Sequence, residues 1–97
     1  MAKRRPEQAW DRCARELGMN IQRLRAARGL SQENVAYAAG ISRYTFQKLE
    51  KGESAPNRAA NPSLRNVMAV AQVLGTTVDA LLPEEWPELR SGLPPRP

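Results

Sequence analysis

The 97-residue sequence predicts an all-α fold, a compact five-helix domain with a helical N-terminal extension. Apolar residues recur every three or four positions, capping residues such as serine precede these segments, and glycine or proline follows them. Hydrophobic residues make up 41% of the chain but aromatic residues only 5%. The core should therefore be aliphatic and rich in alanine, which suits helices better than a sheet. The length allows one small domain with tails.

The first helical segment runs from Glu7 to Arg28. Pro6 suits the first position of this helix and Gly29 suits the turn that ends it. Gly18 interrupts the pattern, so the segment is either one continuous helix or is kinked or broken there. Residues 1–6 form a flexible basic arm, which either follows DNA phosphates or is a solvated tail. The apolar stripe of the segment consists of Trp10, Cys13, Leu17, Ile21 and Leu24.

Two short helical patterns lie between Ser31 and Gly52. Ser31 caps the first and Ser42 caps the second, and Gly40 supplies the sharp turn between them. Both starts also carry an apolar pair that closes the first turn, Leu30 with Val35 and Ile41 with Phe46. A helix, a short glycine-containing turn and a second helix make up a helix-turn-helix, whose second helix can enter a DNA major groove.

The second of these helices, from Arg43 to Lys51, has two different faces. Phe46 and Leu49 should point into the core. The opposite face is polar, exposed and free of acidic residues. Its members are Arg43, Tyr44, Gln47, Lys48 and Lys51.

The chain after Gly52 contains a long loop and two further helices. The loop is predicted from Glu53 to Asn61. Asn61 and Pro62 then suit the N-cap and first position of a fourth helix, which Gly75 ends. The apolar stripe of that helix is predicted to be Leu64, Val67, Met68, Ala71 and Leu74.

A short fifth helix is predicted after Gly75. Thr76 and Asp79 form a capping pattern at its start, and Pro83 stops it. Residues 83–97 are acidic and then proline-rich, and should form an extended tail beyond Arg90.

Three motifs carry a family resemblance: LSQENVA at the first short helix, AGIS at the turn and LEKG at the end of the second helix. Residues 17–82 resemble the Cro and phage-repressor family of DNA-binding domains, also called the XRE family. The resemblance implies a lambda-repressor-like helix-turn-helix domain, with residues 7–16 as an added helical extension. The loop after Gly52 departs from the family because it is longer and offers only Arg58 as a positive charge, opposed by Glu53.

The resemblance also implies which residues contact DNA. Gln32 matches a glutamine that approaches the DNA backbone in the family. Arg43 is the best candidate for reading guanine O6 and N7, with a phosphate as the alternative. Gln47 can pair with adenine, Lys48 with guanine or phosphate, and Tyr44 with a sugar or a thymine methyl group. The expected DNA-binding residues are Gln32, Ser42, Arg43, Tyr44, Gln47, Lys48 and Lys51.

Two further sets of contacts follow from the family. Arg25 and Glu50 match residues that form an ion pair beneath the recognition helix, so the same bridge is expected here. Family members dimerise through their last two helices, and Trp10 is expected either to cover the core or to lie at a dimer seam. The expected dimer contacts are Leu81, Leu82 and Trp86.

The charge distribution favours double-stranded DNA as the partner. The formal net charge is +5 and the sequence pI is about 10.1, values that point to a polyanionic partner. The first hypothesis is a homodimeric, sequence-specific transcription regulator that represses by occluding a promoter. An antitoxin that regulates its own promoter is an alternative, with a protein partner bound through the terminal extensions. A protein-interaction module that keeps the fold without binding DNA is another.

Catalysis and membrane insertion are not expected. The chain has no histidine and a single cysteine, so Cys13 has no histidine partner for nucleophilic activation, and neither a metal site nor a cofactor site is predicted. A lone cysteine forms no internal disulfide, which favours a cytoplasmic setting. The longest uncharged run, residues 66–78, is too short and too polar to span a bilayer.

Overall fold

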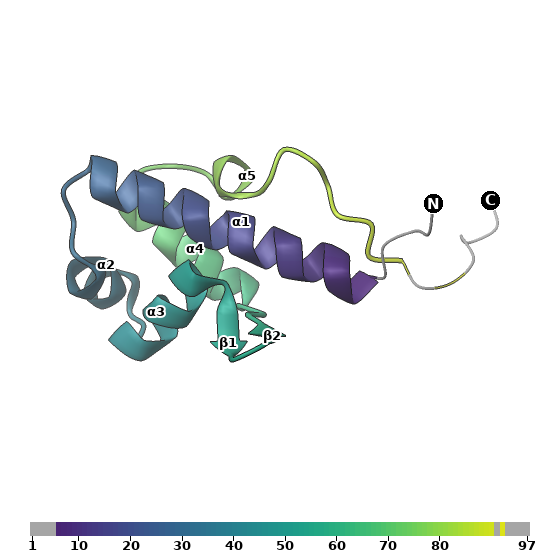
Figure 1. Cartoon of the computed structure of the whole chain (residues 1–97). Helices are drawn as coiled ribbons and strands as arrows, with labels where there is room; N and C mark the ends of the chain where they lie inside the picture. Colours follow the sequence, from purple (N-terminus) through teal and green to yellow (C-terminus); the bar gives the residue numbers. More distant parts are fainter. Residues whose placement is uncertain (1–5, 91, 93–97) are drawn as a thin grey trace.

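The structure is a computed structural model that describes residues 6–90 and residue 92. Most of the expected basic arm and most of the proline-rich tail lie outside these residues. The described chain contains five helices and one two-stranded antiparallel sheet (Figure 1). In order they are α1 (Pro6–Ala27), α2 (Gln32–Ala39), α3 (Arg43–Lys51), β1 (Glu53–Ala55), β2 (Arg58–Ala59), α4 (Leu64–Val73) and α5 (Val78–Leu81).

Helix α1 is the long axis on which the other elements are assembled. It runs without interruption through Gly18, so the predicted N-terminal extension and the first helix of the domain form one helix. Figure 1 shows α2, α3 and the hairpin below α1 and α5 above it. Gly18 lies tightly against α3: a Cβ atom there would lie 2.3 Å from the Glu50 carbonyl oxygen and 2.7 Å from that of Leu49. The glycine thus permits helix packing and does not break the helix.

The core lies between α1 and the four shorter helices. The largest side chains that are fully buried are Ile21, Val35, Phe46, Val70, Leu74 and Leu81. The predicted stripe of α1 faces this core, with Cys13, Leu17 and Ile21 buried. The predicted stripe of α4 was wrong at two positions, because Leu64 and Met68 are exposed and Val70 is buried instead. The inward side is shared by Val67, Val70 and Ala71 of α4 and by its C-cap residue, Leu74.

The helix caps agree with the sequence analysis in the helix-turn-helix and differ after it. Ser31 and Ser42 each accept a hydrogen bond from the backbone N–H three residues on, at 3.0 Å. Helix α4 is capped by Ser63 and not by Asn61, since the Ser63 hydroxyl accepts from the Asn66 N–H at 3.1 Å. Helix α5 is capped by Thr77 and not by Thr76. Both errors arose because neighbouring residues can all cap, and only the packed helix decides which one does.

The segment predicted as a loop after Gly52 contains the hairpin of β1 and β2. The Asn57 backbone adopts φ 62° at its turn, a left-handed conformation that asparagine tolerates better than most residues. The Trp10 indole N–H donates to the Ala60 carbonyl at 2.9 Å, and the Ala60 N–H donates to the Gly52 carbonyl at 2.9 Å. Trp10 therefore attaches the hairpin to α1. Strands of three and two residues are too short to show an alternating pattern in a sequence.

Candidate nucleic-acid interface

Helices α2 and α3 form a helix-turn-helix whose turn is set by Gly40. Its backbone is left-handed, with φ 72°, which glycine adopts without a steric penalty. The next amide, that of Ile41, donates to the Ala36 carbonyl at 3.0 Å and closes the end of α2. Phe46 and Leu49 anchor α3 in the core. The orientation of α3 is therefore determined by buried contacts, which leaves its other side accessible.

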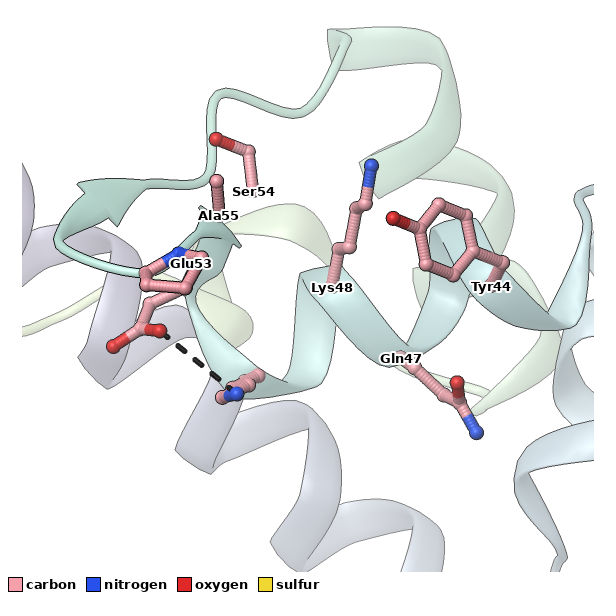
Figure 2. A pocket seen from close by; sticks show the side chains of 8 residues that line it. Tyr44, Gln47, Lys48, Glu53, Ser54 and Ala55 are labelled. Carbon is pink, nitrogen blue, oxygen red and sulfur yellow. Dashed lines mark ion pairs between the residues drawn. The ribbon is translucent and has the colours of Figure 1, made fainter.

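The accessible side of α3 carries the residues expected to read DNA. Arg43, Tyr44, Gln47 and Lys51 are exposed, and Lys48 is half-buried. Ser42 lies at the exposed start of the helix, where its hydroxyl also donates to the Thr45 hydroxyl at 2.8 Å. Figure 2 shows Tyr44, Gln47 and Lys48 projecting from α3 beside the hairpin, and a hollow of about 260 Å³ separates this side from Ser54, Ala55 and Pro56.

An ion pair between Arg25 and Glu50 lies beneath α3. The Arg25 Nε and Nη2 atoms donate to the two carboxylate oxygens at 2.6 and 3.2 Å, a bidentate arrangement. Nη1 donates to the Leu30 carbonyl at 2.9 Å. The side chains are only 16% and 5% exposed, respectively. This pair joins α1 to α3 and to the turn before α2.

Gln32 lies at the start of α2 but is turned toward this ion pair. Its Nε2 donates to Glu50 Oε1 at 2.7 Å, and its Oε1 accepts from Gln47 Nε2 at 3.5 Å. The resemblance implied a contact with the DNA backbone through this residue. In the structure its amide nitrogen is engaged with a buried carboxylate, so Gln32 connects α2 to α3. Sequence reasoning missed this role because the two partners are 18 residues apart.

The two lysines on the accessible side of α3, Lys48 and Lys51, each contact another side chain. The Lys51 ammonium lies 3.9 Å from the Glu53 carboxylate, with the lysine side chain exposed and the glutamate side chain half-buried. The Lys48 ammonium lies 4.1 Å from the centroid of the Tyr44 ring. Glu53 therefore offsets positive charge at the end of α3, whereas the Lys48 ammonium lies over an aromatic face.

The residues expected at a dimer contact have different environments. Leu81 is fully buried in the core of the monomer, so it supports α5 and is not available to a second chain. Leu82 is half-buried. Trp86 is 77% exposed. The Asn20 side-chain amide donates to the Leu81 carbonyl at 2.9 Å and fixes α5 against α1.

The single cysteine of the chain, Cys13, is buried in α1. Burial raises the pKa of the Cys13 thiol, and the nearby Glu16 carboxylate raises it further. The thiolate needed for nucleophilic attack is therefore disfavoured. Among residues 6–90 and 92, no three histidine, cysteine, aspartate or glutamate residues are placed to hold a metal ion. Within the same residues, no helix is both long and apolar enough to cross a membrane.

A helix-turn-helix with two capped helices, a buried ion pair beneath it and a basic, polar accessible side of its second helix is typical of the class of DNA-binding helix-turn-helix domains. Residues 16–84 match the family model described as a helix-turn-helix domain. The chain belongs to this family, and within it to the Cro-like or XRE type. No curated protein matches the chain.

Solved structures with the same fold include several regulators. The restriction-modification controller protein C.AhdI from Aeromonas hydrophila is 31% identical, with a TM-score of 0.61, and the match covers 70% of this chain and 94% of that one. A hypothetical transcription factor, NHTF from Neisseria, is 28% identical, with a TM-score of 0.61 and coverage of 87% and 85%. A chain of the SinR–SinI protein complex is 29% identical, with a TM-score of 0.59 and coverage of 70% and 61%. The fold is thus that of DNA-binding transcription regulators.

Proposed function

We propose that the protein is a homodimeric transcription regulator that binds double-stranded DNA sequence-specifically and represses by occluding a promoter. The observation that carries the proposal is the accessible side of α3. Arg43, Gln47 and Lys48 lie there on a helix held by buried contacts, and the one acidic residue of α3, Glu50, is buried in an ion pair. A recognition helix with this chemistry fits a major groove, where side chains read base edges.

The dimer part of the proposal is supported by the C-terminal segment. Trp86 exposes most of its ring, and such aromatic side chains are favoured as anchors of protein interfaces. A two-fold contact through Trp86 and the half-buried Leu82 would place two copies of α3 on half-sites about 34 Å apart, one helical turn of DNA. The related C.AhdI structure is that of a restriction-modification controller protein, which is consistent with a regulatory role.

The direct experiment is selection of bound sequences from random duplex DNA with the full chain. We expect an inverted repeat whose half-site centres are about 10 base pairs apart. Recovery of no preferred sequence would contradict the proposal. Binding with equal affinity to selected and scrambled duplexes would contradict it equally.

Replacing Arg43 or Gln47 by alanine should relax the base preference at one position in each half-site. The expected loss of discrimination is about 1–3 kcal/mol if the contact is bidentate. Affinities for duplexes that carry each of the four bases at that position measure it. A suitable control is Glu33→Ala, because Glu33 lies in the exposed first turn of α2 and outside the reading surface. If the base preference of a variant is unchanged, the replaced residue does not read a base.

Replacing Trp86 by serine should weaken the dimer. Loss of an interface anchor typically costs about 2 kcal/mol or more, which corresponds to a rise of roughly 30-fold in the dimer dissociation constant. Analytical ultracentrifugation over a range of protein concentrations measures that constant. Leu64→Ser is a matched control, since Leu64 is also exposed but lies on α4. Equal self-association of both variants and the unmodified chain would exclude the proposed contact.

The exposed Trp86 also supports a second candidate function, binding of a protein partner by an antitoxin or interaction module. Leu89 is exposed in the same segment. The other terminal extension is less available, because Trp10 is bonded to the hairpin and Cys13 is buried. A chain that stays monomeric and binds no DNA would favour this alternative.

A further inference from the structure

Tyr44 and Lys48 form a preorganised pair on the recognition helix. They are four residues apart, so they lie one above the other on one side of α3. The Lys48 ammonium is 4.1 Å from the Tyr44 ring centroid, within the range of a cation–π interaction. In Figure 2 the two side chains lie together, whereas Gln47 points away from them. On the accessible side of α3, Lys48 thus contacts Tyr44, whereas Gln47 contacts Gln32.

The free cation of this pair is available for a ligand. Among the described residues, the acidic groups in ion pairs bind Arg12, Arg25, Lys51 and Arg90, and no carboxylate pairs with Lys48. Tyr44 is 66% exposed and is therefore accessible to an approaching duplex. The hollow beside α3 is lined by both residues, together with Lys51 and Glu53 of the neighbouring ion pair.

Contact with the ring limits the conformations of the lysine side chain before DNA arrives. A lysine loses rotamer freedom when its side chain is fixed, and a part of this loss already occurs in the free protein. The ring also occupies one side of the ammonium. The other N–H donors of the ammonium then point away from the ring. The lysine side chain therefore loses less conformational freedom when DNA binds.

We propose that Tyr44 and Lys48 act as one reading unit for guanine, in which the tyrosine ring positions the lysine ammonium toward O6 and N7. Guanine fits because both of these atoms are acceptors and an ammonium offers only donors, whereas adenine presents the N6 donor at the matching place. Tyr44 is here a positioning residue for Lys48. This inference rests on the proposed function, since it requires α3 to lie in a major groove.

The test compares four variants of the full chain with the unmodified protein on the best selected duplex. Tyr44→Phe keeps the ring, Tyr44→Leu removes it, Lys48→Met removes the charge but keeps the stem, and the fourth variant combines Tyr44→Leu with Lys48→Met. Each protein is titrated with duplexes in which one guanine at a time is 7-deazaguanine, which lacks the N7 acceptor. Because both side chains are on the surface, thermal unfolding should be nearly the same for all variants.

The expected result is one guanine per half-site whose replacement weakens binding of the unmodified protein and Tyr44→Phe by about fivefold. The penalty should be smaller for Tyr44→Leu and absent for Lys48→Met. On the selected duplex without 7-deazaguanine, Tyr44→Leu and Lys48→Met should each weaken binding, but the double variant should lose less affinity than the product of the two single losses. The expected coupling in this double-mutant cycle is about two- to tenfold.

Two results would overturn this inference alone: losses that multiply independently, or a guanine penalty in Lys48→Met equal to that of the unmodified protein. In the second case, the dependence of affinity on salt shows what Lys48 binds. If the slope of log affinity against log salt concentration is shallower by about 0.9 in Lys48→Met than in the unmodified protein, Lys48 contacts a phosphate. An unmodified protein without any sequence preference would instead overturn the proposed function, and this inference with it.

Discussion

Replacing Arg25 by methionine is expected to lower the free energy of unfolding by about 3–5 kcal/mol. The Glu50 side chain is only 5% exposed and accepts two hydrogen bonds from Arg25. Without the guanidinium, its charge stays buried with Gln32 as the remaining side-chain partner. A domain of this size is stable by about 5–15 kcal/mol, so the loss is a large fraction of the total. Urea denaturation followed by circular dichroism measures it.

One further variant separates the effect of the unpaired charge from the effect of lost packing. Changing Arg25 and Glu50 together to methionine should recover much of the stability, because no unpaired charge is then buried. Recovery should be incomplete, since the bond from Arg25 to the Leu30 carbonyl is lost in both cases. If the single and double variants were equally unstable, the cost would come from lost packing and not from the unpaired carboxylate.

Replacing Gly18 by alanine is expected to destabilise the protein by about 3 kcal/mol or more. Alanine is the better helix former by roughly 1 kcal/mol, so helix propensity alone predicts the opposite sign. The added methyl group would lie 2.3 Å from the Glu50 carbonyl oxygen and 2.7 Å from that of Leu49. These are backbone atoms and cannot rotate away, so α1 and α3 must separate. The movement should also weaken DNA binding, because α3 carries the proposed reading residues.

Urea denaturation of Gly18→Ala tests this, with Met19→Ala as the matched control. Met19 is the next residue of α1 and is exposed, so its replacement should change stability by less than about 0.5 kcal/mol. A Gly18→Ala variant as stable as the unmodified protein would show that the two helices can separate at little cost.

The sequence was most informative where signals are local. The serine caps at Ser31 and Ser42, the glycine turn at Gly40 and the apolar stripe of α1 all depend on residues within about one helical turn of each other. The same range of interaction explains why spacing alone predicted the accessible side of α3, where four of the five expected residues are exposed and Lys48 is half-buried. The sequence was less informative where several neighbouring residues can each cap a helix, as at the starts of α4 and α5.

The tertiary structure decided what depends on residues distant in the sequence. Gly18 is needed because α3 packs against α1 at that residue. Gln32 turns inward because its amide donates to Glu50. Leu81 belongs to the core and not to a dimer contact. The hairpin is held by Trp10 from 50 residues away. By itself the sequence determined the helix-turn-helix and the polar chemistry of the accessible side of α3, because helix periodicity and capping are short-range. Packing decided which of those polar groups remain accessible, because burial and buried hydrogen bonds arise only when separate helices meet.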